Sequence, residues 1–186
     1  MSIVETELAA PSFLIAVPQL GDPNFVRGVV LLLEHGEDGS MGLLINRPSN
    51  LDIGTFCSSQ SMQFRGDPSS LVFQGGPVQP DRAFILHASD HEGPETENVS
   101  GELKLSYSLE SLRLLVEKPP PRMRIYLGYA GWGPGQLADE VIQGAWLVTN
   151  PVENLTFVDD PDAVWEEALR SMGIDSALLM HSGAVH

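Results

Sequence analysis

Short apolar runs separated by turn residues fill the first half of the chain, and they predict strands rather than helices. Phe13–Val17 is the first run, and residues 27–35 and 41–47 form the next two. Turn-forming glycine, aspartate and serine residues dominate segment 36–40, so we expect these two strands to form a β-hairpin. Val29–Leu33 is apolar at every position, which indicates a central strand that is covered on both faces.

The middle of the chain has a weaker pattern. We expect a short helix over residues 53–57, and strands over 71–74 and 83–88 with a turn at 75–77 between them. Segment 89–102 combines glycine and proline with acidic residues, which predicts a solvated, mobile loop. Its five acidic residues are Asp90, Glu92, Glu95, Glu97 and Glu102.

Three later segments place apolar residues at the spacing of one helix face. Ser108 and Asp160 are placed to cap the first and third helices, and Pro134 stands where the second would begin. Strands are predicted over 124–130 and 145–149, on either side of the second helix. The apolar positions are Leu109, Leu112, Leu115 and Val116, then Leu137, Ala138, Val141 and Ile142, and finally Trp165, Ala168, Leu169 and Met172. Because a hairpin-rich block precedes the helices, the pattern predicts an α+β fold rather than a doubly wound parallel sheet.

The length and composition predict one globular domain. The chain has 186 residues, of which 42% are hydrophobic and 19% charged. We expect a single domain over 1–186, with its core at about 13–173 and loosely ordered ends at 1–10 and 178–186. Apolar runs such as Val29–Leu33 are far shorter than the roughly 18 residues of a membrane helix, so neither a membrane span nor a membrane partner is expected.

The first residues and the cysteine usage predict a cytoplasmic protein. Met1–Ala10 carries Glu5 and Glu7 but no lysine or arginine, unlike a secretory signal. Cys57 is the only cysteine, so an internal disulfide is excluded, which suits a reducing compartment. No basic residue lies within seven positions of Cys57, and we therefore expect a small packed residue rather than a reactive thiol.

The net charge bears on the kind of partner. The chain carries 25 acidic and 10 basic side chains, which gives a formal charge of -15. DNA binding requires a concentrated basic surface, and the closest approach to one is Arg122 with Arg124. Direct binding of nucleic acid is therefore not expected.

The densest glycine pattern is Gly128–Leu137, which runs from a predicted strand into a predicted helix. Backbone N–H groups in such a loop can bind an anion, and the candidate residues are Gly131, Trp132, Gly133 and Gln136. The segment lacks the Gly-Lys-Ser/Thr ending of a P-loop and the spaced glycines of dinucleotide folds. The alternative is a sharp turn under Trp132 with no ligand.

Two further strand ends are candidates for the same site. Gly75 and Gly76 permit either a plain turn or close approach of the backbone to a ligand. Asn46 and Arg47 follow a predicted strand, where the guanidinium could hold a carboxylate or phosphate, or form an internal ion pair.

Motifs for metal or nucleophilic chemistry are absent from the sequence. His87 and His91 have the His-x-x-x-His spacing, but His87 lies in a predicted strand, so the five histidines do not form the helical pair of zinc hydrolases. No Gly-x-Ser-x-Gly elbow occurs. The sequence thus predicts no metal and no cofactor, and it assigns no catalytic residue. A weak hard-cation site among Asp22, Glu34, His35, Glu37 and Asp38 is the alternative.

Several stretches, taken in order, resemble the YqgE/AlgH family of bacterial proteins. They are Phe13–Pro18, Asp22–Phe25, Glu34–His35, Gly42–Pro48, Gly75–Val78, Gly128–Leu137 with Glu140, Gly144–Trp146, and the closing Leu155, Trp165, Ala168, Leu169 and Gly173. The resemblance spans about 13–173, and the ten-residue glycine-rich block is its most specific part. It implies a single α+β domain with a curved, barrel-like, mixed or antiparallel sheet flanked by helices.

For function, the resemblance implies a regulatory protein, since the family is often labelled a transcriptional regulator. The acidic composition and the missing catalytic motifs favour a non-enzymatic binding protein that acts through a protein partner. The alternative hypothesis is a small-molecule-binding protein or enzyme, with a glycine-rich anion site where the three strand ends converge.

Overall fold

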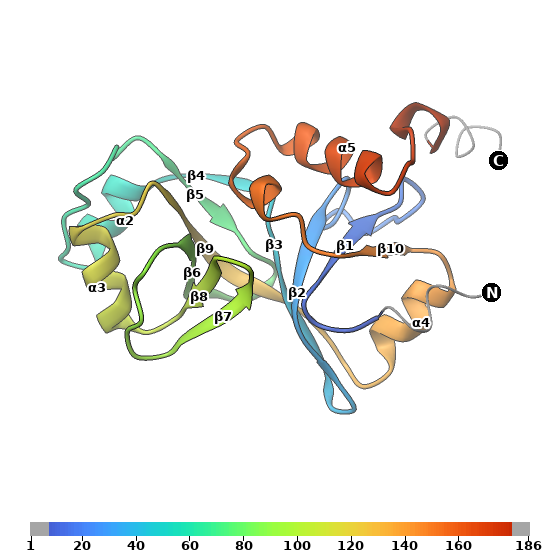
Figure 1. Ribbon diagram of the computed structural model, residues 1–186, viewed down its shortest axis with the longest axis horizontal. Coiled ribbons are helices and arrows are strands. Elements are labelled where there is room, and N and C mark those ends of the chain that lie inside the picture. Colours follow the sequence, from blue (N-terminus) through green and yellow to red (C-terminus); the bar gives the residue numbers. More distant parts are fainter. Residues whose placement is uncertain (1–7, 180–186) are drawn as a thin grey trace.

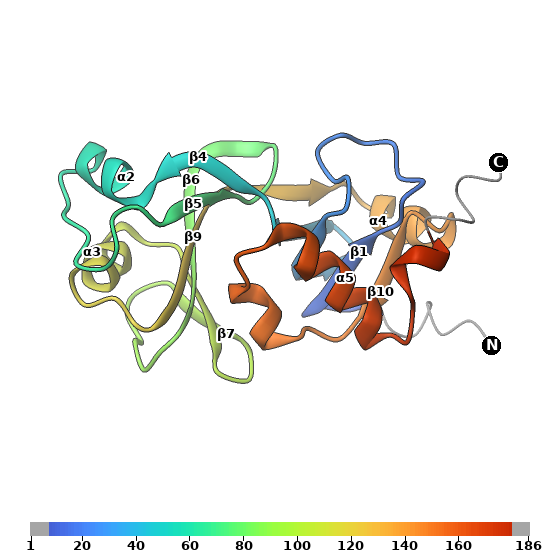
Figure 2. The ribbon, with the colours of Figure 1, turned by 90° about the horizontal axis from the view of Figure 1, so that it is seen from above.

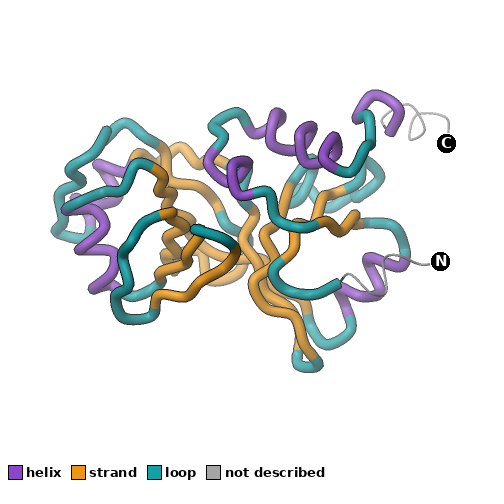
Figure 3. Tube along the Cα trace, in the orientation of Figure 1, coloured by secondary structure: helices purple, strands orange, loops and turns teal. Residues whose placement is uncertain are grey.

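The computed structural model describes residues 8–179. In sequence order its elements are β1 (Ser12–Ala16), β2 (Val29–Gly36), β3 (Gly39–Leu44), β4 (Pro48–Asp52), α2 (Ile53–Ser59), β5 (Leu71–Gln74), β6 (Val78–Ala88), β7 (Thr96–Ser100), β8 (Leu103–Ser106), α3 (Leu109–Glu117), β9 (Arg122–Trp132), α4 (Gln136–Ile142), β10 (Trp146–Thr149), the 3-10 helix η1 (Glu153–Phe157) and α5 (Pro161–Ser171). Figure 3 shows how the strands gather at the centre, with the helices around them.

The strands form one curled sheet, in the order β10-β1-β2-β3-β9-β6-β8-β7. Strand β9 links its two halves, because residues 130–132 pair with β3 while residues 122–129 pair with β6. The pairing is antiparallel except between β5 and β9, and β4 joins the sheet through β5. The fold is a single α+β domain built on a half-barrel, as the sequence and the family resemblance predicted (Figure 1).

The helices cover the sheet on different sides. Viewed from above, α2 and α3 lie at one end of the molecule, and α4 and α5 belong to the other half (Figure 2). Strand β1 shows why both faces of that half are covered: Phe13 and Ile15 pack in the cluster that contains α5, whereas Leu14 and Ala16 pack in the cluster that contains α4. A third cluster joins α2 and α3 to the outer face of β5, β6 and β9.

The strongest local signals are confirmed. Residues 29–32 of β2 are fully buried in the interior of the sheet, and β2 and β3 form the predicted hairpin. The Ser108 hydroxyl accepts a hydrogen bond from the Ser111 N–H, and the Asp160 carboxylate caps α5. These residues set the helix starts because they satisfy backbone donors that have no partner within the helix.

Three predictions about element boundaries were wrong. Segment 89–102 contains strand β7 over 96–100, because pairing with β8 satisfies its backbone although four of its five side chains are polar. Helix α4 begins at Gln136 rather than at Pro134, because Gly135 adopts a left-handed conformation with φ of 74° directly before it. Strand β6 begins at Val78 rather than at residue 83, and β4 and η1 had no counterpart in the prediction.

Candidate functional site

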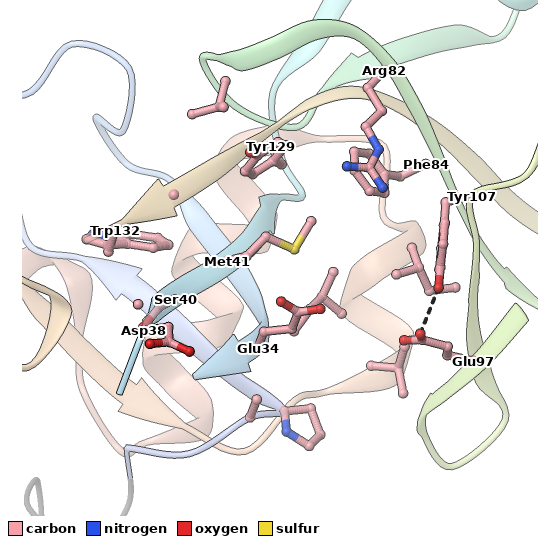
Figure 4. Close-up of a pocket in the computed structure, with 18 of the residues that line it drawn as sticks. Glu34, Asp38, Ser40, Met41, Arg82, Phe84, Glu97, Tyr107, Tyr129 and Trp132 are labelled. Atoms are coloured by element: carbon pink, nitrogen blue, oxygen red, sulfur yellow. Dashed lines mark hydrogen bonds between the residues drawn. The ribbon is translucent and has the colours of Figure 1, made fainter. Parts of the chain in front are cut away.

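The concave side of the half-barrel contains a cavity of about 810 Å³. It lies between the β2–β3 hairpin on one side and β7 on the other, with β9, β6 and β8 between them (Figure 4). The lining residues are Ala10, Pro11, Leu33, Glu34, Asp38, Gly39, Ser40, Met41, Val78, Arg82, Phe84, Glu97, Asn98, Val99, Leu105, Tyr107, Tyr129, Gly131 and Trp132.

Aromatic and apolar side chains form much of the cavity wall. Tyr129 packs edge to face on Phe84, with the ring centroids 6.1 Å apart. Trp132 is held from behind by Phe25 and Trp146, whose ring centroids lie 6.2 and 5.9 Å from its own. These contacts fix the wall, because each ring is packed on a neighbour that belongs to the core.

Three carboxylates project into the same cavity, from Glu34, Asp38 and Glu97 (Figure 4). The Tyr107 hydroxyl donates to Glu97 Oε1 at 2.9 Å, and this hydrogen bond raises the pKa of Tyr107. Arg82 is the single basic residue among those that line the cavity. The site thus combines aromatic walls with an excess of negative charge.

Two strand edges without a partner in the described residues border this cavity. Strand β7 is the last strand of the sheet and pairs only with β8. On the other side, β1 pairs with β2 as far as Leu32, although β2 continues to Gly36. Leu33 and Glu34 from β2 and residues 97–99 from β7 line the cavity, so it occupies an open seam in the half-barrel.

The predicted site residues Gly75 and Gly76 approach other parts of the backbone closely. A Cβ atom added to Gly75 would lie 2.3 Å from the Gly128 carbonyl oxygen, and one added to Gly76 would lie 2.2 Å from the Tyr129 carbonyl carbon. The Gly75 N–H also donates to the Leu127 carbonyl at 2.8 Å. Glycine is required here because two glycine-rich segments cross with no room for side chains.

Asn46 and Arg47 also contact the protein itself. Asn46 Oδ1 accepts from the Val29 N–H at 2.8 Å, and its Nδ2 donates to the carbonyls of Arg27 and Pro161. Arg47 donates to the Val26 carbonyl at 2.7 Å, and partial burial lowers its pKa.

The structure places the remaining predicted residues near the end of β9. Gly131 and Trp132 line the large cavity. The Gly133 N–H donates to Gln136 Oε1 at 3.0 Å, so these two residues contact each other. Gly76 borders a smaller cavity of about 340 Å³ beside Gln74 and Pro77. Of the predicted site residues, Gly131 and Trp132 line the main cavity and the others do not. Ligand contacts by all of them stay predictions.

Sequence reasoning missed several residues that line the cavity, above all Arg82, Tyr107 and Glu97. They come from β6, the start of the α3 connection and β7, and no spacing rule joins them. Three successive residues of the mostly polar segment 96–100, at positions 97–99, line the cavity, so no alternation of apolar and polar residues marked them in the sequence.

A buried polar network lies on the opposite face of β6 and β8. The fully buried His87 ring contacts Ser89 Oγ through Nδ1 at 2.7 Å and Ser106 Oγ through Nε2 at 2.8 Å. Ser106 Oγ lies 2.7 Å from the Oγ1 atom of Thr96, which is the first residue of β7. The network anchors the edge strand to the body of the sheet.

No group of three or more histidine, cysteine, aspartate or glutamate side chains within residues 8–179 is arranged to hold a metal ion. None of the helices in that part of the chain is long and apolar enough to cross a membrane.

Cys57 is fully buried, and burial raises the pKa of its thiol. We expect a disulfide reagent such as dithionitrobenzoate to leave the native protein unlabelled at pH 8 and to label it stoichiometrically in denaturant. The absorbance of the released nitrothiobenzoate measures the labelling rate of the native protein and that of the denatured protein. Rapid labelling without denaturant would contradict this packing.

The fold and the cavity define a single-domain α+β protein with an acidic, aromatic-walled cavity in an open half-barrel. A family model described as AlgH-like matches residues 13–177, so the chain belongs to the AlgH-like family. The resemblance inferred from the glycine-rich block is thereby confirmed.

Individual relatives agree with this assignment. A UPF0301 protein of Myxococcus xanthus is 46% identical over 172 residues, which make up 92% of this chain and 94% of that protein. The chain is similar to the AlgH protein of Pseudomonas aeruginosa, whose solution structure has a TM-score of 0.73 at 37% identity, with 91% of each chain covered. A crystal structure of a Corynebacterium diphtheriae protein, at 23% identity and a TM-score of 0.68, shares the fold, over 89% of this chain and 87% of that one.

Proposed function

We propose that the protein is a non-enzymatic binding protein that regulates a protein partner by holding an extended, basic segment of it in the concave cavity. The observation that carries this proposal is the open seam, where the free edges of β7 and of the outer part of β2 border one cavity. An unpaired strand edge readily pairs with an added strand. Main-chain hydrogen bonds to the seam would supply affinity, and the cavity would supply selectivity for side chains.

The charge of the cavity supports a basic segment. Glu34, Asp38 and Glu97 outnumber the single Arg82 among the lining residues. The net charge of -15 adds a long-range field that attracts cations and speeds their encounter with the protein. Lysine or arginine side chains would lie near the carboxylates while their aliphatic stems contact Met41 and Tyr129.

The arrangement of the hydroxyl and imidazole groups favours binding over catalysis. His87 and Ser106, which are hydrogen-bonded to each other, are fully buried and do not line the cavity. His35 Nδ1 lies 2.7 Å from Ser40 Oγ at the cavity rim. This pair is formed by opposite residues of the β2–β3 hairpin, and among the described residues no carboxylate hydrogen-bonds to the His35 ring to orient it as a triad would require.

Regulation through a partner also agrees with the regulatory label of the family, because so acidic a chain gives little counter-charge to DNA phosphates. A cytoplasmic location, which the single cysteine predicts, belongs to the same proposal.

An array of random octapeptides probed with labelled protein tests the proposal. We expect the bound peptides to be enriched in lysine and arginine, and N-methylation of their backbone to reduce binding because it removes strand hydrogen bonds. The double variant Glu34→Lys and Asp38→Lys reverses the charge of the cavity rim. It should weaken the binding of basic peptides by about tenfold or more.

Glu37→Lys is the matched control, because Glu37 is exposed on the same hairpin but does not line the cavity. It should preserve most of the binding. Bound peptides with no excess of basic residues, or equal binding by the double variant and the wild type, would contradict the proposal.

A further inference from the structure

Arg82 stands out among the cavity residues because it is the one cation among several carboxylates. Its guanidinium carbon lies 4.9 Å from the centroid of the Phe84 ring and 6.0 Å from that of Tyr107. Stacking on two rings restricts the long side chain to a few rotamers. Less conformational entropy is therefore lost when the guanidinium binds a ligand.

The guanidinium of Arg82 has no carboxylate within ion-pair distance in residues 8–179. By contrast, Arg27, Arg122 and Arg124 each form a salt bridge there. Figure 4 shows the Arg82 head group directed into the cavity, on the side away from Glu34 and Asp38. Arg82 is exposed, and its N–H donors thus face the cavity without an ion-pair partner among residues 8–179.

We infer that Arg82 binds the C-terminal carboxylate of the extended basic segment, so that the cavity takes the end of a chain rather than an internal stretch. This inference rests on the proposed function and specifies its ligand further. The planar guanidinium can donate two parallel hydrogen bonds to a carboxylate. Capture of a terminal carboxylate is a recurring mode of peptide recognition.

The charge of the cavity argues for the terminal carboxylate over an acidic side chain. Aspartate or glutamate within the segment would be repelled by Glu34, Asp38 and Glu97. A basic segment that avoids acidic residues still has one anion, at its terminus. Basic side chains would then lie toward the hairpin, where Figure 4 places Glu34 and Asp38.

The experiment uses two versions of the random octapeptide array with the full-length protein. One version presents free C-terminal carboxylates, and in the other the C-terminus is amidated. We expect the free-carboxylate peptides to bind about tenfold or more tightly, as a charge-assisted hydrogen bond predicts. The preference should vanish in Arg82→Gln and persist in part in Arg82→Lys, which keeps the charge but loses the bidentate geometry.

Arg113→Gln is the control, since it removes a positive charge from α3 that does not line the cavity. It should leave the carboxylate preference unchanged. Equal binding of basic free-carboxylate and amidated peptides would overturn this inference while the proposed function stands. A preference for free-carboxylate peptides that persists in Arg82→Gln would also overturn it. So would a preference for peptides with internal aspartate or glutamate that does not depend on whether the C-terminus is free or amidated. Absence of basic peptides from both versions would overturn the proposed function and this inference together.

Discussion

Replacing Asn46 with alanine is expected to lower the free energy of unfolding by about 4 kcal/mol. The side chain is 2% exposed and makes three hydrogen bonds, to the Val29 N–H and to the carbonyls of Arg27 and Pro161. Alanine would leave three backbone groups without partners, of which the Val29 N–H is buried and the two carbonyls are partly buried. A fully buried group without a partner costs about 1 to 3 kcal/mol, and a partly buried one costs less. The loss is large because Asn46 connects β2 to the start of α5 across the core.

Urea denaturation followed by circular dichroism measures this change. Asn50→Ala is the control, because Asn50 is exposed on β4, and its effect should stay within about 0.5 kcal/mol. If the free energy of unfolding of the Asn46 variant fell by less than about 1 kcal/mol, the three hydrogen bonds would not be stabilising the fold. Asn46 would then be open again to the role in ligand binding that its place at a strand end suggested.

Predictions from sequence succeeded where a residue's local surroundings decide its structure. Ser108 and Asp160 cap helices because a short polar side chain just before an apolar stripe can accept hydrogen bonds from the free backbone N–H groups of the first helical turn. The continuous apolar run of β2 required burial on both faces, which restricts it to the interior of a sheet. These features depend on neighbours within a few residues.

Predictions failed where pairing with distant strands decides the structure. Residues 96–100 have few apolar side chains and thus resemble a loop, yet β8 supplies their backbone partners and Thr96 contacts Ser106. The first residues of β6 include Pro80, which favours an edge or a bulge, and the pairing between β6 and β9 is interrupted between Val78 and Ala83.

The candidate site was only partly accessible to sequence reasoning. The glycine pattern at Gly75 and Gly76 was compatible with a turn or with a nearby ligand, and the structure shows that another backbone segment lies against both residues. The charge balance of the cavity depends on Glu34 and Arg82, which are 48 positions apart and line the same cavity only because the sheet curls. Such a juxtaposition leaves no trace in local spacing.

Acid conditions are expected to destabilise the protein through His87 by about 2 kcal/mol at pH 5 and about 3 kcal/mol near pH 4. Burial, with smaller contributions from the charges of His91 and Lys104, lowers the pKa of His87 from 6.5 to about 4. Above pH 6.5 the ring is neutral in both folded and unfolded chains, so it causes no pH dependence. Between 6.5 and 4 the unfolded chain binds a proton that the folded protein excludes, and stability falls throughout this window.

Urea denaturation at pH 7.5, 6, 5 and 4.5, compared between the wild type and His87→Leu, isolates the contribution of this residue. Leucine fills a similar volume and does not titrate, so the variant should lose some stability at pH 7.5 but show a flatter profile down to pH 4.5. Asp52 and Asp67, whose hydrogen bonds to Thr55 and Ser69 lower their pKa values below 3.8, lose their contributions only at more acidic pH. Parallel profiles for the two proteins would mean that water reaches the His87 ring. A flatter profile in the variant would instead show that protonation of His87 destabilises the fold through this network, which holds Thr96 at the start of β7 through Ser106.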